Sequence, residues 1–266
     1  LKALATAFEQ RLDYYIDIMG NSAEDSHLGR RQMALSSPWT LYGARLEELR
    51  NAFAGRSAII VSAGPSLDKN IHLLADKRED YVIIAVDTIV EKLMSRGVKP
   101  HFVCVLERGY ALYLQCFRRL YSRWRHELAD VVLVPQSVCT PQIAGRWPGP
   151  VAVVGKRDIN LEQAIIGGLM GGTVLPSGAS VSHMALGLAG RLGVDSIALV
   201  GQDLAYGDSG ESHATEYTFL GQETYESGIA EKERLSIPGI DGGLVRTNHW
   251  WKYFRDLFAS MIPMLG

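Results

Sequence analysis

The sequence predicts an α/β fold built on a doubly wound, mostly parallel sheet with an N-terminal helical arm. Three observations lead to this prediction. From about residue 56 onward, short runs rich in β-branched residues alternate with helical stretches. These runs are apolar throughout, which is typical of parallel strands covered on both faces. Residues 1–50 show only helical patterning, so we divide the chain into a helical arm (1–50) and a Rossmann-like domain (51–266).

The arm is expected to contain two helices. Apolar residues recur three or four positions apart between Leu4 and Met19, as on one face of a helix. We expect a polar break over residues 21–26 and a second helix over residues 38–50. Packing on the main domain is the simplest role for this arm, and dimerisation or a link to a preceding domain are the alternatives.

In the main domain, strands are expected over residues 57–61, 81–86, 102–106, 131–134, 151–154 and 196–200. Helices are expected over residues 67–77, 88–96, 110–126 and 179–192. Ligands of doubly wound sheets bind outside the carboxyl ends of the strands. We therefore expect the chemistry in the loops that follow the strands.

Composition excludes several classes of protein. The 266 residues include 27 Lys and Arg against 29 Asp and Glu, and this near-zero net charge gives no general attraction to nucleic acid. An apolar content of 47 % excludes a disordered chain. The cysteines, Cys104, Cys116 and Cys139, form no CxxC pair, so we expect neither a disulfide framework nor a zinc site, and we predict a reducing, cytoplasmic location.

Two segments bear on export and membranes. Charged residues interrupt the first twenty positions, so no export signal is expected there, and Leu1 in place of Met is what a piece of a longer protein would show. Residues 163–190 are uncharged and long enough for a membrane span. Their many glycines and serines, with a proline and a histidine, instead indicate a loop followed by the start of a helix, and no span is expected.

The first candidate site is the loop over residues 62–68. Gly64, which follows Ala63, allows a tight turn and a close approach to a ligand, Pro65 fixes one dihedral angle, and Ser66 is a natural helix N-cap. The free amides of the next helix predict an anion site. The fingerprints GxGxxG and GxxxxGK[ST] do not occur in the sequence, and a plain turn with a helix cap is the alternative.

Two carboxylates follow the second and third strands. Asp87 is interpreted as a hydrogen-bond acceptor for a ribose or a base, with a helix cap as the alternative. Glu107 precedes Arg108 at the next strand end, which indicates a polar pocket beside Asp87, with a solvated loop as the alternative.

The strongest local feature is the small-residue opening of the helix that begins near residue 181. Ser177, Gly178, Ala179 and Ser180 precede a long apolar segment and predict a second anion-accepting helix N-terminus. His183 lies on the same side of this helix as Ser180. We interpret it as a packed or capped side chain.

A further loop follows the last strand. It contains Gly201, Gln202, Asp203 and Tyr206, and then His213. A carboxylate that orients a histidine is the usual preparation of a general base, so we predict that Asp203 and His213 meet. A plain surface loop is the alternative. The aromatic residues after Trp250 indicate a packing helix, or the lining of an acceptor site.

The order of these segments resembles a known family. The segments are Ala63-Gly64-Pro65-Ser66-Leu67, Asp87, Val98-Lys99-Pro100-His101, Ser177-Gly178-Ala179-Ser180-Val181, Gly201-Gln202-Asp203-Leu204-Ala205-Tyr206 and Ser212-His213-Ala214. Over about residues 57–260 they resemble the central domain of the bacterial motility accessory factor (Maf) proteins, of the MptE-like or DUF115 group. That resemblance implies glycosylation of flagellin with nonulosonic acids, which are sugars similar to sialic acid.

Two relatives share parts of this pattern. Bacterial CMP-sialic-acid sialyltransferases have a similar Gly-Pro-Ser-Leu loop and Ser-Gly helix start, which hold CMP without a metal. The archaeal 6-hydroxymethylpterin pyrophosphokinases use ATP and Mg²⁺. An acidic residue at the end of the third strand would suit that metal, and here it is Glu107, followed by Arg108.

The resemblance implies a glycosyltransferase that moves a nonulosonic acid from a CMP donor to Ser or Thr of flagellin, without a further cofactor. One alternative is a pterin pyrophosphokinase that uses ATP and Mg²⁺. Another is a non-catalytic module that binds a nucleotide or chaperones flagellin.

Each candidate residue has a role under this hypothesis. Residues 63–66, residues 177–180, Gly201 and Gln202 would bind the nucleotide, and Asp87 and Glu107 would contact its ribose or base. Tyr206 would protonate the leaving phosphate, and His213, oriented by Asp203, would deprotonate the acceptor. The hypothesis requires the helix openings at residues 66 and 177 to meet at one rim of the sheet.

Overall fold

Five parallel strands form the central sheet of the computed structural model, which describes residues 22–157, 159–216, 224–227 and 230–264. The helix expected over residues 1–20 lies outside the described residues. The strand order is β4-β3-β2-β1-β7, with the bounds β1 (Ser57–Val61), β2 (Tyr81–Val86), β3 (Phe102–Val105), β4 (Val132–Pro135) and β7 (Ser196–Val200). Strands are added outward from β1 to β4, and the chain then returns to place β7 on the other side of β1. The predicted doubly wound, mostly parallel sheet is therefore confirmed, with a topological switch point between β1 and β7.

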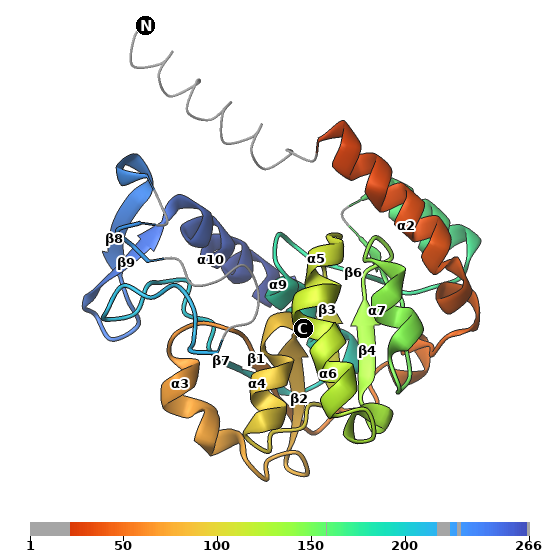
Figure 1. Cartoon of the computed structure of the whole chain (residues 1–266), viewed down its shortest axis with the longest axis horizontal. Coiled ribbons are helices and arrows are strands. Elements are labelled where there is room, and N and C mark those ends of the chain that lie inside the picture. The colour runs from red at the N-terminus through yellow and green to blue at the C-terminus, as the bar shows by residue number, and fades with distance from the viewer. Residues whose placement is uncertain (1–21, 158, 217–223, 228–229, 265–266) are drawn as a thin grey trace, which may run out of the picture.

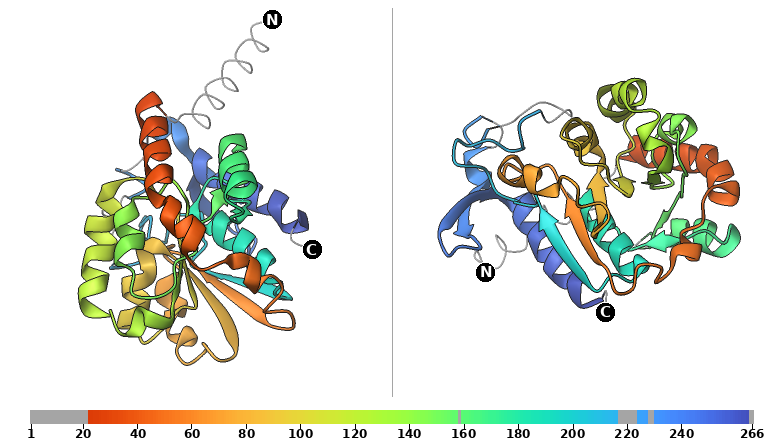
Figure 2. Two further views of the ribbon diagram at one scale, coloured as in Figure 1. Left: turned by 90° about the vertical axis from the view of Figure 1, so that its right-hand side faces the viewer. Right: turned by 90° about the horizontal axis from the view of Figure 1, so that it is seen from below.

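Helices cover both faces of this sheet (Figures 1 and 2). Neighbouring residues on one strand enter different cores, because side chains alternate across a strand. Ile59 and Ile83 belong to one core, while Ile60 and Ile84 belong to the other. The first core is closed by α3 (Leu67–Asn70), α4 (Val90–Ser95), α6 (Arg118–Arg123) and α7 (Pro141–Arg146), and the second by α9 (Val181–Leu192) and α10 (His249–Met261).

Short helical turns extend several of these helices, so the predicted helices are recovered with shorter regular parts. The segments that extend them are η2 (Ile71–Leu74), η3 (Asp87–Ile89), α5 (Tyr110–Leu112), the π-helical η4 (Tyr113–Phe117) and η8 (Ile262–Met264). Three further turns, η1 (Leu46–Leu49), η5 (Glu127–Asp130) and η7 (Glu231–Glu233), stand apart from these helices.

Two strand predictions need correction. Residues 151–154 do not form a regular strand, although Val151 and Val154 make isolated parallel bridges to Leu133 and Gln136 at the β4 edge. The prediction that both faces of each strand are covered by other parts of the protein was also wrong for β7. That strand lies at the other edge of the sheet, and its side chains are exposed or half-buried, with Leu199 44 % exposed.

The arm contains one long helix where a break and a second helix were expected. Helix α2 (Ala23–Tyr42) begins inside the expected break, because the Ser22 hydroxyl accepts a hydrogen bond from the Asp25 amide and caps the first turn. Pro38 lies inside this helix. It cannot donate to the Ala34 carbonyl, and the Ser37 hydroxyl donates to that carbonyl instead (2.8 Å). The helix packs on α7 of the main domain, as expected for the arm.

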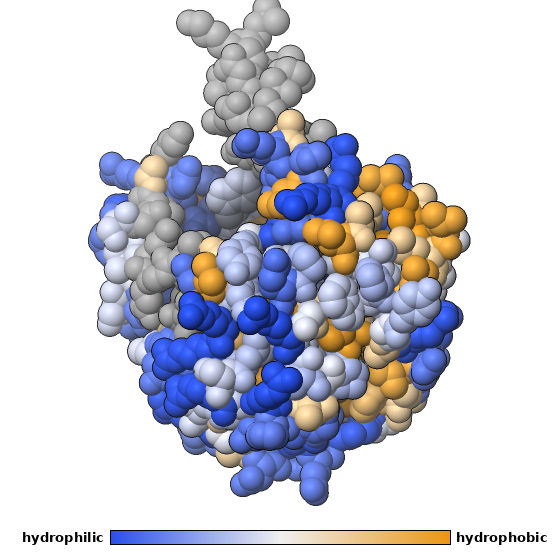
Figure 3. Space-filling view, turned by 45° about the vertical axis from the view of Figure 1, so that its right-hand side comes forward, coloured by the Kyte–Doolittle hydropathy of each residue, from blue (hydrophilic) through white to orange (hydrophobic). Residues whose placement is uncertain are grey.

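The uncharged stretch over residues 163–190 is not a loop at its start. Helix α8 (Asn160–Glu162) continues directly into a π-helical segment, η6 (Gln163–Leu169). A two-stranded parallel pair, β5 (Gly155–Lys156) and β6 (Val174–Leu175), flanks this helix. Figure 3 shows apolar side chains gathered on the side where α8 and η6 lie, and Leu161 and Leu169 are 47 % and 80 % exposed. Of the helices that the structure describes, none combines the length and apolar character needed to cross a bilayer.

A β-hairpin follows the main sheet and was not predicted. Its antiparallel strands are β8 (Arg234–Pro238) and β9 (Leu244–Asn248). Asn248 at its end caps α10 by accepting from the Trp251 amide (2.8 Å), so the hairpin fixes where the C-terminal helix begins.

Candidate functional site

A cavity of about 330 Å³ lies at the carboxyl ends of β1, β2, β3 and β7. Segments that are far apart in the sequence form its walls. They are residues 62–64, residues 86–88, Glu107, residues 179–182, residues 201–205, and Ser212 with His213. Trp251 and Phe254 of α10 complete the lining. The two helix openings expected to meet at one rim therefore contribute to a single cavity.

Most of the predicted site residues line this cavity, but some do not. The predicted residues that line it are Ala63, Gly64, Asp87, Glu107, Ala179, Ser180, Gly201, Gln202, Asp203 and His213. Among the described residues, Pro65, Ser66, Ser177, Gly178 and Tyr206 are not part of the lining. Ser177 is fully buried, and its hydroxyl donates to the Leu175 carbonyl (3.2 Å).

The loop after β1 is fastened to the loop after β7. The Gly64 amide donates to the Gly201 carbonyl (2.7 Å), and the Ser66 amide donates to Oδ2 of Asp203 (2.7 Å). A side chain at Gly201, which has a positive φ of 68°, would collide with the Ser62 carbonyl. The helix that follows, α3, has only four residues. The prediction of an anion site at this helix is therefore wrong, because the amides of this loop already have acceptors within the protein.

The start of α9 forms part of the cavity lining. The first amides of an α-helix have no intrahelical acceptor. In α9 the amide of His183 is the first to find one, at the Ser180 carbonyl (3.1 Å), while Val181 and Ser182 line the cavity. Of the two predicted anion sites, only this helix N-terminus has the geometry to bind a phosphate.

His183 is a packed side chain, in agreement with its interpretation from the sequence. Its Nδ1 is 2.5 Å from the Ser180 hydroxyl, and its Nε2 is 3.0 Å from the Phe254 carbonyl. Its ring lies 4.2 Å from that of Phe258, between centroids. Burial lowers the pKa of His183 to about 4, so the neutral ring ties the start of α9 to α10.

Asp87 lines the cavity as a buried carboxyl group whose ionisation is unfavourable. It is 3 % exposed, and burial together with the nearby Glu107 carboxylate raises its pKa to about 7. Its Oδ1 accepts from the Thr88 amide (2.8 Å), while its Oδ2 is buried without a hydrogen-bond partner among the described residues. Such an orphaned acceptor is suited to a ligand hydroxyl, an amino group or a cation.

His213 lines the cavity in its neutral form, because burial lowers its pKa to about 4. Its Nδ1 is 2.9 Å from the Ser212 hydroxyl. The orienting role predicted for Asp203 is therefore filled at this nitrogen by Ser212, since Asp203 is directed to the Ser66 amide. The Ala214 amide donates to the Ala63 carbonyl (2.8 Å) and fastens the histidine loop to the loop after β1.

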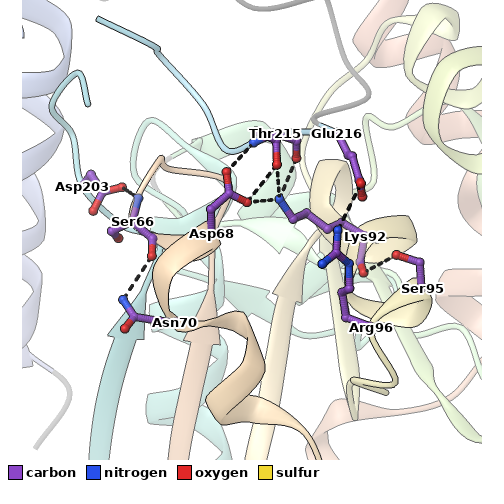
Figure 4. A network of polar contacts seen from close by, with 9 residues as sticks. All are labelled: Ser66, Asp68, Asn70, Lys92, Ser95, Arg96, Asp203, Thr215 and Glu216. Atoms are coloured by element: carbon purple, nitrogen blue, oxygen red, sulfur yellow. Dashed lines mark hydrogen bonds and ion pairs between the residues drawn. The ribbon is translucent and has the colours of Figure 1, made fainter. Parts of the chain in front are cut away.

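A buried lysine anchors the other end of the histidine loop (Figure 4). Nζ of Lys92 on α4 donates to the carbonyl of Thr215 (2.7 Å) and to its hydroxyl (3.1 Å). The same amine pairs with Asp68 on α3, whose second oxygen accepts from the Thr215 amide (2.7 Å). Lys92 thus holds a segment that lies two residues beyond His213.

Tyr206 does not reach the cavity. The residue is 6 % exposed, its hydroxyl accepts from Nδ2 of Asn248 (3.3 Å), and its ring lies 4.5 Å from that of Trp251. The hairpin and α10 enclose it. Its predicted role as a proton donor to a phosphate therefore lacks the necessary geometry.

Sequence reasoning missed several residues of the site. Thr88 and Ser182 line the cavity, and Lys92 supports it, while Ser62 and Ala205, which also line it, lie in the predicted loops but were given no role. Trp251 and Phe254 belong to the aromatic C-terminal segment, for which an acceptor site was one of the two interpretations. Lys92 gave no signal, because a lysine inside a helix is ordinarily a solvated residue.

Within the described residues, no group of three or more His, Cys, Asp or Glu side chains is arranged to hold a metal ion. Magnesium usually takes only one or two carboxylates from a protein, together with substrate phosphates. Asp87 and Glu107 form such a pair, and the unpartnered Oδ2 of Asp87 fits a cation.

Comparisons with known proteins agree on the fold. The family model described as 6-hydroxymethylpterin diphosphokinase MptE-like matches residues 38–209. The chain is similar to the solved structure of the Maf glycosyltransferase from Magnetospirillum magneticum AMB-1, with a TM-score of 0.65 and 20 % sequence identity. The similarity covers 89 % of this chain and 35 % of that one, so the chain spans about a third of the neighbour's length. No curated protein sequence matches the chain.

Proposed function

The chain belongs to the 6-hydroxymethylpterin diphosphokinase MptE-like family, and we propose that its cavity binds a nucleotide. We further propose that the protein is a glycosyltransferase. The donor would be a CMP-activated nonulosonic acid, and the acceptor a Ser or Thr hydroxyl of flagellin. The observation that carries this proposal is the N-terminus of α9, which opens into a cavity at the carboxyl ends of the strands. The similarity in fold to a Maf glycosyltransferase supports it.

The start of α9 would stabilise the leaving phosphate. The amides of Val181 and Ser182 and the positive end of the helix dipole are fixed before the reaction, so they need no reorganisation as charge develops on CMP. The bond between the anomeric carbon and the phosphate oxygen breaks, and its electron pair stays with the phosphate. A bond forms from the anomeric carbon to the acceptor oxygen. The proton of the acceptor hydroxyl passes to His213, which lines the cavity and is neutral.

The acidic side of the cavity would select the nucleoside. Oδ2 of Asp87 has no partner among the described residues, so a ribose hydroxyl or the amino group of cytosine would satisfy it. The pairing of Asp203 with the Ser66 amide would shape this side of the cavity without touching the ligand. Three free, buried cysteines support the proposal that the reaction takes place in the reducing cytoplasm.

A second function is favoured by the same carboxylate pair. A pterin pyrophosphokinase would bind ATP with Mg²⁺, and Asp87 and Glu107 would hold the metal. Mg²⁺ would supply charge neutralisation of the phosphates when bound. The oxygen ligands and the unpartnered Oδ2 fit this group as well as they fit a nucleoside.

Calorimetric titration of the whole chain with CMP, and with ATP in the presence and absence of Mg²⁺, separates the two functions. We expect CMP to bind without a metal. Binding of ATP only with Mg²⁺, and no binding of CMP, would establish the kinase instead. A nucleotide-binding module without activity would bind CMP but fail to transfer the sugar to flagellin.

Substitution Val181→Pro tests the phosphate site directly. Proline is tolerated at the first position of a helix and removes one amide there. The extended conformation of Ser180 (φ −142°, ψ 162°) is also compatible with a following proline. We expect about a tenfold loss of CMP affinity, whereas Val181→Ala, which keeps the amide, retains the affinity. Equal affinities of the two variants would exclude the α9 amide as a phosphate ligand.

A further inference from the structure

A second cavity, of about 590 Å³, adjoins the first at the carboxyl ends of β3 and β4. The two cavities share Glu107, Ala179 and Phe254 as lining residues. Because Ala179 is next to Ser180, the N-cap residue of α9, a phosphate held at that helix would lie where the two cavities meet. A group attached to the phosphate therefore has direct access to the second cavity.

Gln136 marks the second cavity as a binding site. It directly follows β4, and the residue is only 2 % exposed. Its backbone is fully paired, since its amide donates to Val105 (2.9 Å) and its carbonyl accepts from Cys139 (2.9 Å). Its side-chain Nε2 is buried without a partner among the described residues, although the residue lines the cavity. A buried amide group is costly to leave unpaired, so this position points to a ligand.

The walls of this cavity combine charged groups with aromatic rings. Arg108 and Lys156 line it together with the acidic Asp25 and Glu107. Arg108 is held in place by the arm, because Asp25 pairs with its guanidinium and Gln32 donates to its carbonyl (3.0 Å). Helix α2 thus contributes a wall of the site and does more than pack on the main domain.

Helix α10 supplies the apolar side of the cavity. Trp250, Tyr253 and Phe254 all line it. Aromatic rings offer a large rigid face for the C–H groups of a ligand, while charged and amide groups around them bind its polar edge.

We propose that the second cavity binds the sugar that is attached to the nucleotide, with the Gln136 amide bonded to a sugar hydroxyl or acylamino group. This rests on the proposed function and identifies the part of the protein that recognises the transferred group. Hydroxyls both donate and accept hydrogen bonds, which matches a wall that carries donors and acceptors of both charge signs. The nucleoside and phosphate stay in the first cavity, and the glycosidic bond to be broken lies at the junction beside Ala179.

Calorimetry with two probes tests this division of the site. CMP occupies only the first cavity, whereas CMP-N-acetylneuraminic acid also places a sugar in the second. For Gln136→Leu we expect CMP affinity to change less than twofold and the affinity for the CMP-sugar to fall about tenfold, as for the loss of one buried hydrogen bond. Gln163→Leu, at an exposed glutamine of η6, should leave both affinities unchanged.

The same variant has a second readout that needs no ligand. Leucine removes an unpaired buried amide and keeps a similar volume, so Gln136→Leu should unfold at a higher urea concentration than the parent protein. A stabilised variant with a selective loss of CMP-sugar affinity supports the proposal. Equal losses for CMP and the CMP-sugar, or no loss for either, overturn it while leaving nucleotide binding intact. No binding of CMP by the parent protein overturns the proposed function itself. In that case, binding of 6-hydroxymethylpterin at the second cavity would assign this cavity to a pterin.

Discussion

Replacing Asp87 by asparagine should make the folded protein more stable at pH 8, although it alters the cavity. The reason is that the carboxylate is buried beside Glu107 without full hydrogen bonding, so its ionisation opposes folding. Asparagine has nearly the same shape and carries no charge. Its amide can also donate a hydrogen bond toward the Glu107 carboxylate.

The size of this effect follows from the pKa of Asp87. Its ordinary value is 3.8, and the folded protein raises it to about 7. A tenfold change in proton affinity corresponds to about 1.4 kcal/mol, so ionising Asp87 in the folded state costs up to about 4 kcal/mol. Because the folded pKa is raised, the protonated group stabilises the fold fully below the unfolded pKa, near 4. That stabilisation is lost as the pH rises through about 7.

Urea unfolding at pH 5 and pH 8, followed by tryptophan fluorescence, measures the effect. The parent protein should lose about 2–3 kcal/mol more than Asp87→Asn between these two pH values, because the pH dependence extends only from pH 5 to about 7 in this interval. Asp208→Asn provides the control, because the Asp208 side chain is 97 % exposed and should not change the pH dependence. If the parent protein and Asp87→Asn lose the same unfolding free energy between pH 5 and pH 8, the ionisation of Asp87 does not oppose folding, and its pKa is not raised by burial in the cavity.

Two further substitutions test the support of the cavity. Gly64→Ala would place a Cβ 2.6 Å from the Gly201 carbonyl and against Asp203, so we expect a loss of about 1–3 kcal/mol in unfolding free energy together with weaker CMP binding. Gly168→Ala, on η6, has only an ordinary contact at 3.9 Å and should be tolerated. Lys92→Met removes the cation that pairs with Asp68 and the donor to the Thr215 carbonyl, and it should cost about 1–3 kcal/mol, measured by urea unfolding. Arg96→Met breaks an exposed pair with Glu216 and should cost less than about 1 kcal/mol, so similar losses in both variants would remove the special role of Lys92.

The central sheet could be predicted because its strands have continuous apolar runs. The bounds of β1, β2 and β7 agree with the predictions, since each run ends where a glycine, serine or acidic residue begins a loop. The apolar pattern did not reveal which strand lies at an edge, and β7 reads like a buried strand while its side chains are largely exposed. The order of strands in a sheet depends on tertiary contacts, so the hydrophobic periodicity of a single sequence does not reveal it.

Two other elements were not predicted correctly, and in both cases the reason lies in the local sequence. The β8–β9 hairpin had a turn signal in Gly239 and Asp241-Gly242-Gly243, but its strands contain polar residues and lack the continuous apolar runs by which the strands of the main sheet were predicted. The start of helix α2 was predicted at residue 38 instead of Ala23, because a proline commonly stands at the first position of a helix, and compensation by the Ser37 hydroxyl depends on a rotamer.

The sequence predicted that the loops of the candidate site lie at one rim of the sheet, where most of their residues line one cavity, but it did not predict the hydrogen bonds there. Parallel topology alone brings the loops after β1 and β7 and the start of α9 to one rim. The partner of Asp203 depends on side-chain directions across that rim, so the sequence pointed to His213 while the structure has the Ser66 amide. Tyr206 was misassigned because the hairpin that buries it had not been predicted.

Three of the unpartnered polar atoms in the described part of the chain support the proposal that the rim binds a ligand. Among the described residues, the Ser62 hydroxyl, Oδ2 of Asp87 and Nε2 of Gln136 are all buried without hydrogen-bond partners. These residues stand at the carboxyl ends of β1, β2 and β4 and line the two adjoining cavities. Folding leaves each of these groups without the water it had in the unfolded chain, so the fold is less stable than it would be with apolar residues there. A ligand that satisfies them at once recovers this stability on binding, and only a ligand that spans both cavities can do so. These three groups are therefore a further argument for our proposal that the ligand is a nucleotide joined to a second polar group.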